Sequence, residues 1–325
     1  MSTVLAAIQW VVSFRDRYGI RVLNLSLGTD STQSYRVDPL NYAVERAWAE
    51  GIVVVVSAAN RGPAAGTVTK PGDDPFVVTV GAVDDRGTPG LGDDRLPDFS
   101  SRGPTPDGFV KPDVVAPGTH LVSLRSPGSL IDEIYPPSTE GPYRKGSGTS
   151  MSAAVVSGVA ALMLQARPDA RPDEVKHALR TTARPVAADD ANAVGSGLVD
   201  AYAAALEAPT GRANAGLARS NGLGSLGDSR GSLDLAVSTL PEILLTARLT
   251  AQLLLWDPLG YTVGAWSAPT WYTSAHGLVA WQDTEWTGDN WGGDNWGGSS
   301  WYGVGDDADV YGRPGPASAW YGAWE

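Results

Sequence analysis

Residues 52–60 of the sequence are Ile-Val-Val-Val-Val-Ser-Ala-Ala-Asn. The first five form a continuous apolar run, which predicts a strand buried on both faces. A helical pattern precedes this run: Asp38 is a typical N-cap, Pro39 suits the first helical position, and Gly51 suits the helix end. A helix that leads into a fully buried strand is typical of a parallel sheet covered by helices.

The same alternation of amphipathic helices and short apolar strands extends over about the first 205 residues. The expected helices are residues 3–17, 39–50, 151–166 and 172–182, and the expected strands are residues 21–27, 52–56 and 76–83. Such a pattern indicates βα units around a parallel sheet. The sequence therefore predicts the α/β class, with a doubly wound, mostly parallel sheet.

The composition excludes several classes of function. The chain has 325 residues, of which 42% are hydrophobic and 18% are charged, a balance typical of a globular protein. Its net charge of −12 opposes binding to the phosphate backbone of nucleic acids. The absence of cysteine excludes disulfides, thiolate metal sites and cysteine nucleophiles. The first residues lack the features of a signal peptide, and no stretch predicts a membrane span.

The sequence divides into three parts. These are a compact domain at residues 1–206, a linker with a short apolar segment at residues 207–256, and a low-complexity C-terminal tail rich in Trp, Gly and Asp at residues 257–325. In the tail, Trp recurs on a five-residue grid from Trp266 to Trp301, and His276 fills the one vacant position. Two interpretations are open: the rings stack on sugars of a polysaccharide or cell surface, or the tail is a spacer.

A serine at a predicted helix start is the strongest sign of chemistry. Residues 148–152 are Gly-Thr-Ser-Met-Ser and lead into the helix at residues 151–166. The free N–H groups and the dipole at a helix N-terminus favour the negative charge that develops when a serine attacks a carbonyl group. A serine at this place is more often only an N-cap, so the case for a nucleophile depends on the other motifs.

Four further motifs precede the serine in the chain. They are residues 24–28 (Asn-Leu-Ser-Leu-Gly), residues 54–60 (Val-Val-Val-Ser-Ala-Ala-Asn), residues 98–104 (Asp-Phe-Ser-Ser-Arg-Gly-Pro) and residues 111–118 (Lys-Pro-Asp-Val-Val-Ala-Pro-Gly). Together with residues 148–152, this series resembles the subtilisin-like serine proteases, the subtilases, over about residues 3–205. The resemblance implies the C-terminal two thirds of a subtilase catalytic domain.

The resemblance also implies roles for individual residues. Ser150 matches the nucleophile, Asn60 the side-chain donor of the oxyanion hole, and Thr149 an auxiliary oxyanion donor. The residues that match the two strands beside the substrate pocket, where substrate backbone would pair by β-augmentation, are Ser26, Leu27, Gly28, Ser57, Ala58 and Ala59. The alternative for these six residues is a purely structural role in the sheet.

The sequence departs from the family pattern at several positions. Ala59 stands where the family usually has Gly, so its methyl group is expected to narrow the pocket or disturb the strand end. By contrast, Lys70-Pro71 agrees with the family pattern, because it matches a segment in which relatives often hold a cis peptide bond. The aspartate box Asp-Ser/Thr-Gly and the histidine box His-Gly-Thr-His are both absent before Ser150. The chain is therefore expected to represent an N-terminally truncated subtilase.

None of the three histidines is a convincing general base. His120 directly follows residues 111–118, on what is a late loop in the family; His177 lies beside Lys176 on a predicted solvated helix face; and His276 lies in the tail. Without a base to take its proton, the Ser150 hydroxyl is expected to be a poor nucleophile.

No cofactor is identifiable from the residues, and none is assigned as a metal ligand; calcium is implied by the resemblance alone. The acidic pairs that could offer oxygen ligands are Asp73-Asp74, Asp84-Asp85 and Asp93-Asp94, although such pairs more often lie in solvated turns. The sequence thus predicts a serine endopeptidase acting on polypeptides through an acyl-enzyme, extracellular by resemblance and inactive in this form. The alternative is a catalytically dead, subtilase-like module that binds peptides or surfaces.

Overall fold

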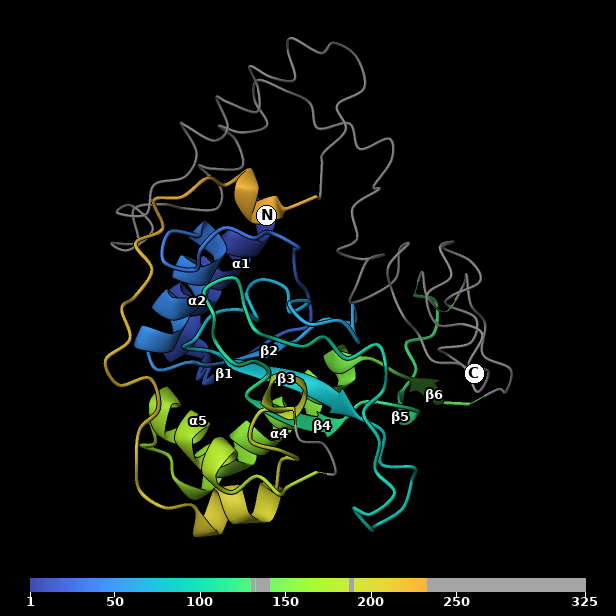
Figure 1. The fold of residues 1–325 in the computed structure, drawn as a ribbon. Coiled ribbons are helices and arrows are strands. Elements are labelled where there is room, and N and C mark those ends of the chain that lie inside the picture. The colour runs from blue at the N-terminus through green and yellow to red at the C-terminus, as the bar shows by residue number, and fades with distance from the viewer. Residues whose placement is uncertain (130–131, 133–140, 187–189, 233–325) are drawn as a thin grey trace.

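Four parallel strands form the central sheet of the computed structural model, which describes residues 1–129, 132, 141–186 and 190–232 (Figure 1). The strands are β1 (Val22–Leu25), β2 (Val53–Ser57), β3 (Val78–Val83) and β4 (Val114–Pro117). Their order in the sheet is the same as their order in the chain. In β2, Val55 lies opposite Asn24 on one side and Val78 on the other. The predicted parallel sheet is confirmed.

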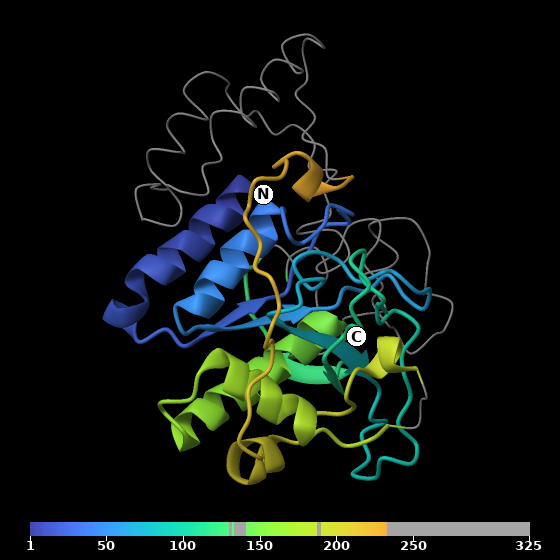
Figure 2. The same ribbon diagram turned by 60° about the vertical axis from the view of Figure 1, so that its left-hand side comes forward.

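Helices cover both faces of this sheet (Figures 1 and 2). α1 (Ser2–Tyr18) and α2 (Pro39–Ala49) lie on one face, and α4 (Thr149–Ala166) and α5 (Pro172–Thr181) lie on the other. The remaining described elements are the antiparallel pair β5 (Leu121–Leu124) and β6 (Tyr143–Gly146), the short helix α6 (Ala191–Val194), the π-helical turn η1 (Ala203–Glu207) and the 3₁₀ turn η2 (Asp228–Arg230). The α/β class and the doubly wound arrangement are confirmed.

Local sequence signals account for the elements around β2. Every side chain of the run at residues 52–56 is completely buried, and burial of a Val or Ile side chain stabilises a fold by about 1.5–3 kcal/mol. α2 begins where the Asp38 carboxylate accepts the backbone N–H groups of Leu40 and Asn41, at 2.8 and 3.3 Å. Pro39 occupies the first turn of the helix, as expected.

α4 packs against the sheet more extensively than the other described helices. It contacts all four strands of the sheet. By length and composition alone it could cross a membrane, with a mean hydropathy of 1.4 over 18 residues, but half of that window is buried inside the protein. Core helices of globular domains pass the same test. The contacts with the sheet show that α4 is a core helix of this domain.

Residues 208–232 are here called the strap. They run along the body of the protein from the layer of α4 and α5 to the layer of α1 and α2 (Figure 2). Near the start of the strap, the backbone N–H of Ala213 donates to the Asp173 carbonyl in α5 at 2.9 Å. Near its end, the N–H of Gly224 donates to the Val37 carbonyl just before α2 at 2.6 Å. The strap therefore bonds to both layers.

The expected three-part division of the chain stays a prediction. Apart from Glu207, which ends η1, the strap is the described portion of the segment expected as a linker, residues 207–256. The tail at residues 257–325, with its Trp repeat, lies outside the described residues.

Candidate active site

Ser150 is the second residue of α4. Gly148 precedes the helix with a φ of 145°, a conformation that residues with side chains rarely adopt, and its carbonyl accepts the N–H of Met151 at 3.0 Å. The first turn of α4 carries no acidic side chain. The positive end of the helix dipole is therefore not neutralised there, and it can stabilise negative charge that develops beside Ser150.

Asn60 follows β2 and is completely buried. Its Oδ1 accepts two hydrogen bonds from Thr149, one from the backbone N–H and one from the hydroxyl, both at 2.9 Å. The Nδ2 amide nitrogen faces the turn before Ser150, since a methyl group on Gly148 would lie 3.3 Å from it. The two bonds from Thr149 thus fix the orientation of the carboxamide and direct an N–H donor toward the turn that carries Ser150.

Thr149 orients Asn60 in this arrangement. Its side chain is fully buried, and its hydroxyl proton is donated to Asn60 Oδ1. A hydroxyl has one proton to donate, so the same group does not point a donor at an oxyanion in this state. The contact therefore gives Thr149 a positioning role, and its role as an auxiliary oxyanion donor stays a prediction.

The two segments expected beside the substrate lie at the carboxyl ends of β1 and β2. They are Ser26, Leu27 and Gly28 after β1, and Ser57, Ala58 and Ala59 at and after the end of β2. Ser26 Oγ donates to the backbone carbonyl of Ser150 at 3.1 Å, which ties the first segment to the start of α4. Parallel strands end at the same edge of a sheet, where ligands of α/β proteins usually bind. The structure therefore brings all nine predicted site residues to one edge of the sheet.

Two backbone features bear on expectations from the sequence. Ala59 has a φ of 85°, in the left-handed region that favours glycine, so the backbone is strained just after β2; narrowing of the pocket by its methyl group stays a prediction. The peptide bond between Lys70 and Pro71 is cis.

Thr69 lies against both of these segments, although no motif indicated it. Its backbone N–H donates to the Ala58 carbonyl at 3.4 Å, and a methyl group on Gly28 would overlap its Oγ1. Thr69 is buried, and its hydroxyl has no hydrogen-bond partner among the described residues. The sequence signal that points to this residue is its position directly before Lys70-Pro71.

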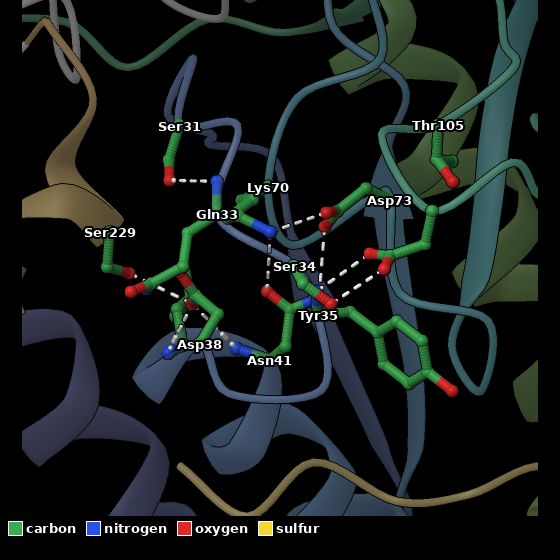
Figure 3. A network of polar contacts seen from close by, with 12 residues as sticks. Ser31, Gln33, Ser34, Tyr35, Asp38, Asn41, Lys70, Asp73, Thr105 and Ser229 are labelled. Carbon is green, nitrogen blue, oxygen red and sulfur yellow. Dashed lines mark hydrogen bonds and ion pairs between the residues drawn. The ribbon is translucent and has the colours of Figure 1, made fainter. Parts of the chain in front are cut away.

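A buried polar network supports the loop after β1 (Figure 3). Lys70 Nζ bonds to Asp73 Oδ2 at 2.5 Å and to Asn41 Oδ1 at 3.5 Å, and the backbones of Lys70 and Thr29 exchange two hydrogen bonds. Burial lowers the pKa of Lys70, but the carboxylates of Asp73 and Asp38 outweigh this effect and raise the pKa above its ordinary value. Lys70 therefore links the loop after β1, which its backbone bonds, to α2, which its ammonium group contacts through Asn41.

Asp38 extends this network to the strap. Besides capping α2, its carboxylate accepts hydrogen bonds from Gln33 Nε2 at 2.8 Å and from Ser229 Oγ at 2.9 Å. The backbone carbonyl of Ser229 in turn accepts a bond from Thr29 Oγ1 at 2.7 Å. The strap thus contributes to the support of the same loop (Figure 3).

Two carboxyl groups, those of Glu45 and Asp74, lie together under the strap. Both residues are buried, and Glu45 accepts the N–H of Ser220 on both carboxylate oxygens at 3.0 Å. Burial and the neighbouring charge of Asp74 raise the pKa of Glu45 to about 9; burial also raises the pKa of Asp74 to about 7. Asp74 Oδ2 has no hydrogen-bond partner among the described residues, so ionisation of Asp74 would leave a buried negative charge poorly compensated at this atom.

These raised pKa values predict a stability that falls as the pH rises. The carboxyl groups stay protonated in the folded chain where they ionise in the unfolded chain, so the cost of burying them begins near pH 4 and grows to about pH 9. Glu45→Gln keeps the size of the side chain and one oxygen that can accept the Ser220 N–H, and it removes one titrating group. We expect this variant to lose less free energy of unfolding than the wild type between pH 5 and pH 9, measured by urea denaturation. Glu207→Gln, at an exposed position, is the control, and equal pH dependence of all three proteins would contradict the assignment.

The described histidines occupy different surroundings. His120 lies between β4 and β5, and its backbone N–H donates to Ser147 Oγ at 2.9 Å. His177 lies in α5, where its ring packs against Gly211 of the strap, so the expectation of a solvated face was wrong: the residue is half-buried. His276 lies outside the described residues.

The acidic pairs do not fit a calcium site. Asp73 pairs with Lys70, and Asp84 Oδ2 lies 3.2 Å from Arg86 Nε, so both carboxylates already have cationic partners. Within residues 1–129, 132, 141–186 and 190–232, no three His, Cys, Asp or Glu side chains are placed to hold a metal ion. No step of the chemistry below is therefore assigned to calcium.

A serine at a helix start, beside an asparagine amide fixed at the end of a parallel sheet, is the arrangement of a serine protease of the subtilase type. The chain belongs to the Subtilase family, whose model matches residues 1–224. Serine protease AprX of Bacillus subtilis (strain 168) is 42% identical over 207 residues, which cover 62% of this chain and 47% of that protein. Subtilisin DY of Bacillus licheniformis is 32% identical over 206 residues, which cover 63% of this chain and 62% of that protein.

Solved structures of proteases also match this chain. Fervidolysin from Fervidobacterium pennivorans, described as a keratinolytic enzyme related to subtilisin, matches with 30% identity and a TM-score of 0.48, over 64% of this chain and 29% of that chain. The present chain thus spans about half the length of AprX and about three fifths of that of subtilisin DY.

Proposed function

We propose that Ser150 is the nucleophile of a serine endopeptidase that hydrolyses peptide bonds through an acyl-enzyme. The observation that carries the proposal is the Asn60 carboxamide, which Thr149 holds with its amide nitrogen toward the turn before Ser150. Attack of Ser150 Oγ on the scissile carbonyl makes an oxyanion, which the Asn60 amide and the start of α4 would stabilise. The amine then leaves, and water hydrolyses the ester to release the acid.

The substrate would be an extended polypeptide. The segments at residues 26–28 and 57–59 lie at the carboxyl ends of adjacent strands, where a substrate backbone can pair by β-augmentation. The buried hydroxyl of Thr69 lies at the place where the two segments meet.

Residues 1–325 alone would be nearly inactive as a peptidase, since the sequence contains neither the aspartate box nor the histidine box. The base that takes the proton of Ser150, and the carboxylate that orients this base, would have to come from a segment that carries those boxes.

A fluorophosphonate probe, which reacts with activated serines, tests the assignment. The chain is complemented with a subtilase segment that carries both boxes, fused upstream or added in trans. We expect labelling of the complemented chain, loss of labelling in Ser150→Ala, and unchanged labelling in the exposed control Ser126→Ala. Labelling that survives Ser150→Ala would show that another serine is the nucleophile.

The same experiment decides between the enzyme and a catalytically dead binding module. A complemented chain that stays unlabelled but binds an extended peptide would favour the module. Extracellular action and contact of the Trp-rich tail with a cell surface or polysaccharide belong to this proposal as well. They rest on the family resemblance and on the sequence repeat, respectively.

A further inference from the structure

Two lysine ammonium groups and one carboxylate are buried together on the side of the sheet that α5 covers. Lys176 of α5, Lys111 and Asp113 are all at most 5% exposed. Asp113 lies between the lysines: its Oδ1 is 3.1 Å from Lys176 Nζ, and its Oδ2 is 2.7 Å from Lys111 Nζ. A buried charge is stable only when groups of opposite charge or hydrogen-bonding groups lie close to it, so each buried ammonium requires such partners.

The Lys176 ammonium is surrounded by oxygen atoms. Besides Asp113 Oδ1, its Nζ contacts three consecutive backbone carbonyls just before β3: those of Pro75 at 2.6 Å, Phe76 at 3.3 Å and Val77 at 2.9 Å. Consecutive carbonyl oxygens turned toward one point repel one another unless a positive charge lies between them. Carbonyl oxygens plus a carboxylate are the donors that hard cations take in proteins.

We propose that these four oxygens form a cation-binding site in which the ammonium group of Lys176 replaces a bound metal ion. We call this group of oxygens, from residues 75–77 and Asp113, the cation cradle. The family resemblance implies a metal, whereas in this chain the oxygens suited to one are filled by a side chain from α5. The inference is independent of the proposed peptidase activity.

The charges of the cradle indicate which ion could replace the lysine. Lys111 and Asp113 balance each other, so Lys176 contributes a single positive charge. A monovalent ion keeps that balance, whereas Ca²⁺ would add a second positive charge beside the Lys111 ammonium. Potassium resembles an ammonium group in size and is bound by carbonyl oxygens elsewhere. The cradle without its lysine is therefore expected to bind K⁺.

The protonation state sets the pH of the test. Burial lowers the pKa of Lys176 to about 7, although the Asp113 carboxylate favours the charged form; Lys111 and Arg180 oppose it. The Lys111 and Lys176 charges lower the pKa of Asp113 to about 2 against the effect of burial. The other carboxyl group that faces these lysines is that of Asp74. At pH 6 the Lys176 ammonium and the Asp113 carboxylate are therefore both charged.

The test compares thermal unfolding of the full 325-residue chain and its variants at pH 6, followed by circular dichroism. Ionic strength is kept constant while tetramethylammonium chloride is replaced by KCl, with a chelator present. We expect the Tm of the wild type to be the same in both salts. Lys176→Ala empties the cradle, so its Tm should fall, and KCl should raise it again by about 5 °C in a saturable way.

Three controls separate ion binding from general salt effects. Lys176→Met fills the space of the lysine side chain with an uncharged side chain of similar length. The Tm of this variant should therefore fall and should not respond to KCl. The double variant Lys176→Ala with Asp113→Asn should likewise not respond. Arg180→Ala, at an exposed position of the same helix, should behave as the wild type.

Several outcomes would overturn the proposal. One is a Tm of Lys176→Ala that is the same in KCl and in tetramethylammonium chloride. A second is failure of Lys176→Ala to fold in any of the salts. Another is an equal response to KCl in Lys176→Met, because that variant has no room for the ion. In a parallel titration without the chelator, rescue of Lys176→Ala by CaCl₂ but not by KCl would contradict the assignment of a monovalent site.

Discussion

Residues 1–325 alone are expected to hydrolyse peptide amides on the order of 10⁶-fold more slowly than the same chain complemented with an aspartate box and a histidine box. This is about the loss of kcat known for removal of the catalytic histidine in subtilisin, a member of the same family. The physical reason is that the Ser150 hydroxyl is a weak nucleophile until a base takes its proton. Hydrolysis of a fluorogenic peptide by the two preparations measures the ratio.

Ser150→Ala in both preparations is the control for contaminating proteases. Turnover of about 1 per second or more by the uncomplemented chain, lost in Ser150→Ala, would show that the chain already contains a base. The residue to test next would be His120, whose backbone bonds to Ser147, three residues before the serine.

Asn60→Ala in the complemented chain is expected to lower kcat by about 10²–10³-fold, the magnitude known for loss of the corresponding donor in subtilisin. KM should change little, because the amide bonds most strongly to the tetrahedral oxyanion and only weakly to the substrate carbonyl. Steady-state kinetics with a peptide substrate measure both constants. Asn221→Ala, at an exposed position of the strap, is the matched control.

A rise in KM equal to or larger than the fall in kcat would contradict this role. It would place Asn60 among the residues that merely bind substrate. The buried bonds between Thr149 and Asn60 Oδ1 would then be structural in purpose.

Short-range signals account for the parts of the fold that the sequence predicted well. The Val run of β2 and the capping residues of α2 act within a few residues of chain, so their pattern is readable directly. The nine candidate site residues came from the family resemblance of their motifs, and the parallel sheet brings those motifs together at one edge. β4 was not predicted as a strand, because it has only four residues and ends at Pro117, a residue unfavourable to strands.

The parts that the sequence could not predict depend on contacts between distant residues. Lys176 contacts the carbonyl of Pro75 although 101 positions separate them. A lysine in an amphipathic helix pattern is ordinarily assigned to the solvated face, and only the fold shows that this one is buried. Thr69 was missed for the same reason, since its contact with Gly28 exists only after two loops have met.

The strap gives the two helical layers a second connection besides the sheet. The chain completes α5 on one face and then returns to the loop before α2 on the other, where Ser229 bonds to Asp38. Separation of α1 and α2 from the sheet therefore requires release of the strap, and the two events become one cooperative step. A single backbone cut within residues 208–216 would remove this coupling while leaving every strand of the sheet intact, so the two helical layers could then separate without release of the strap.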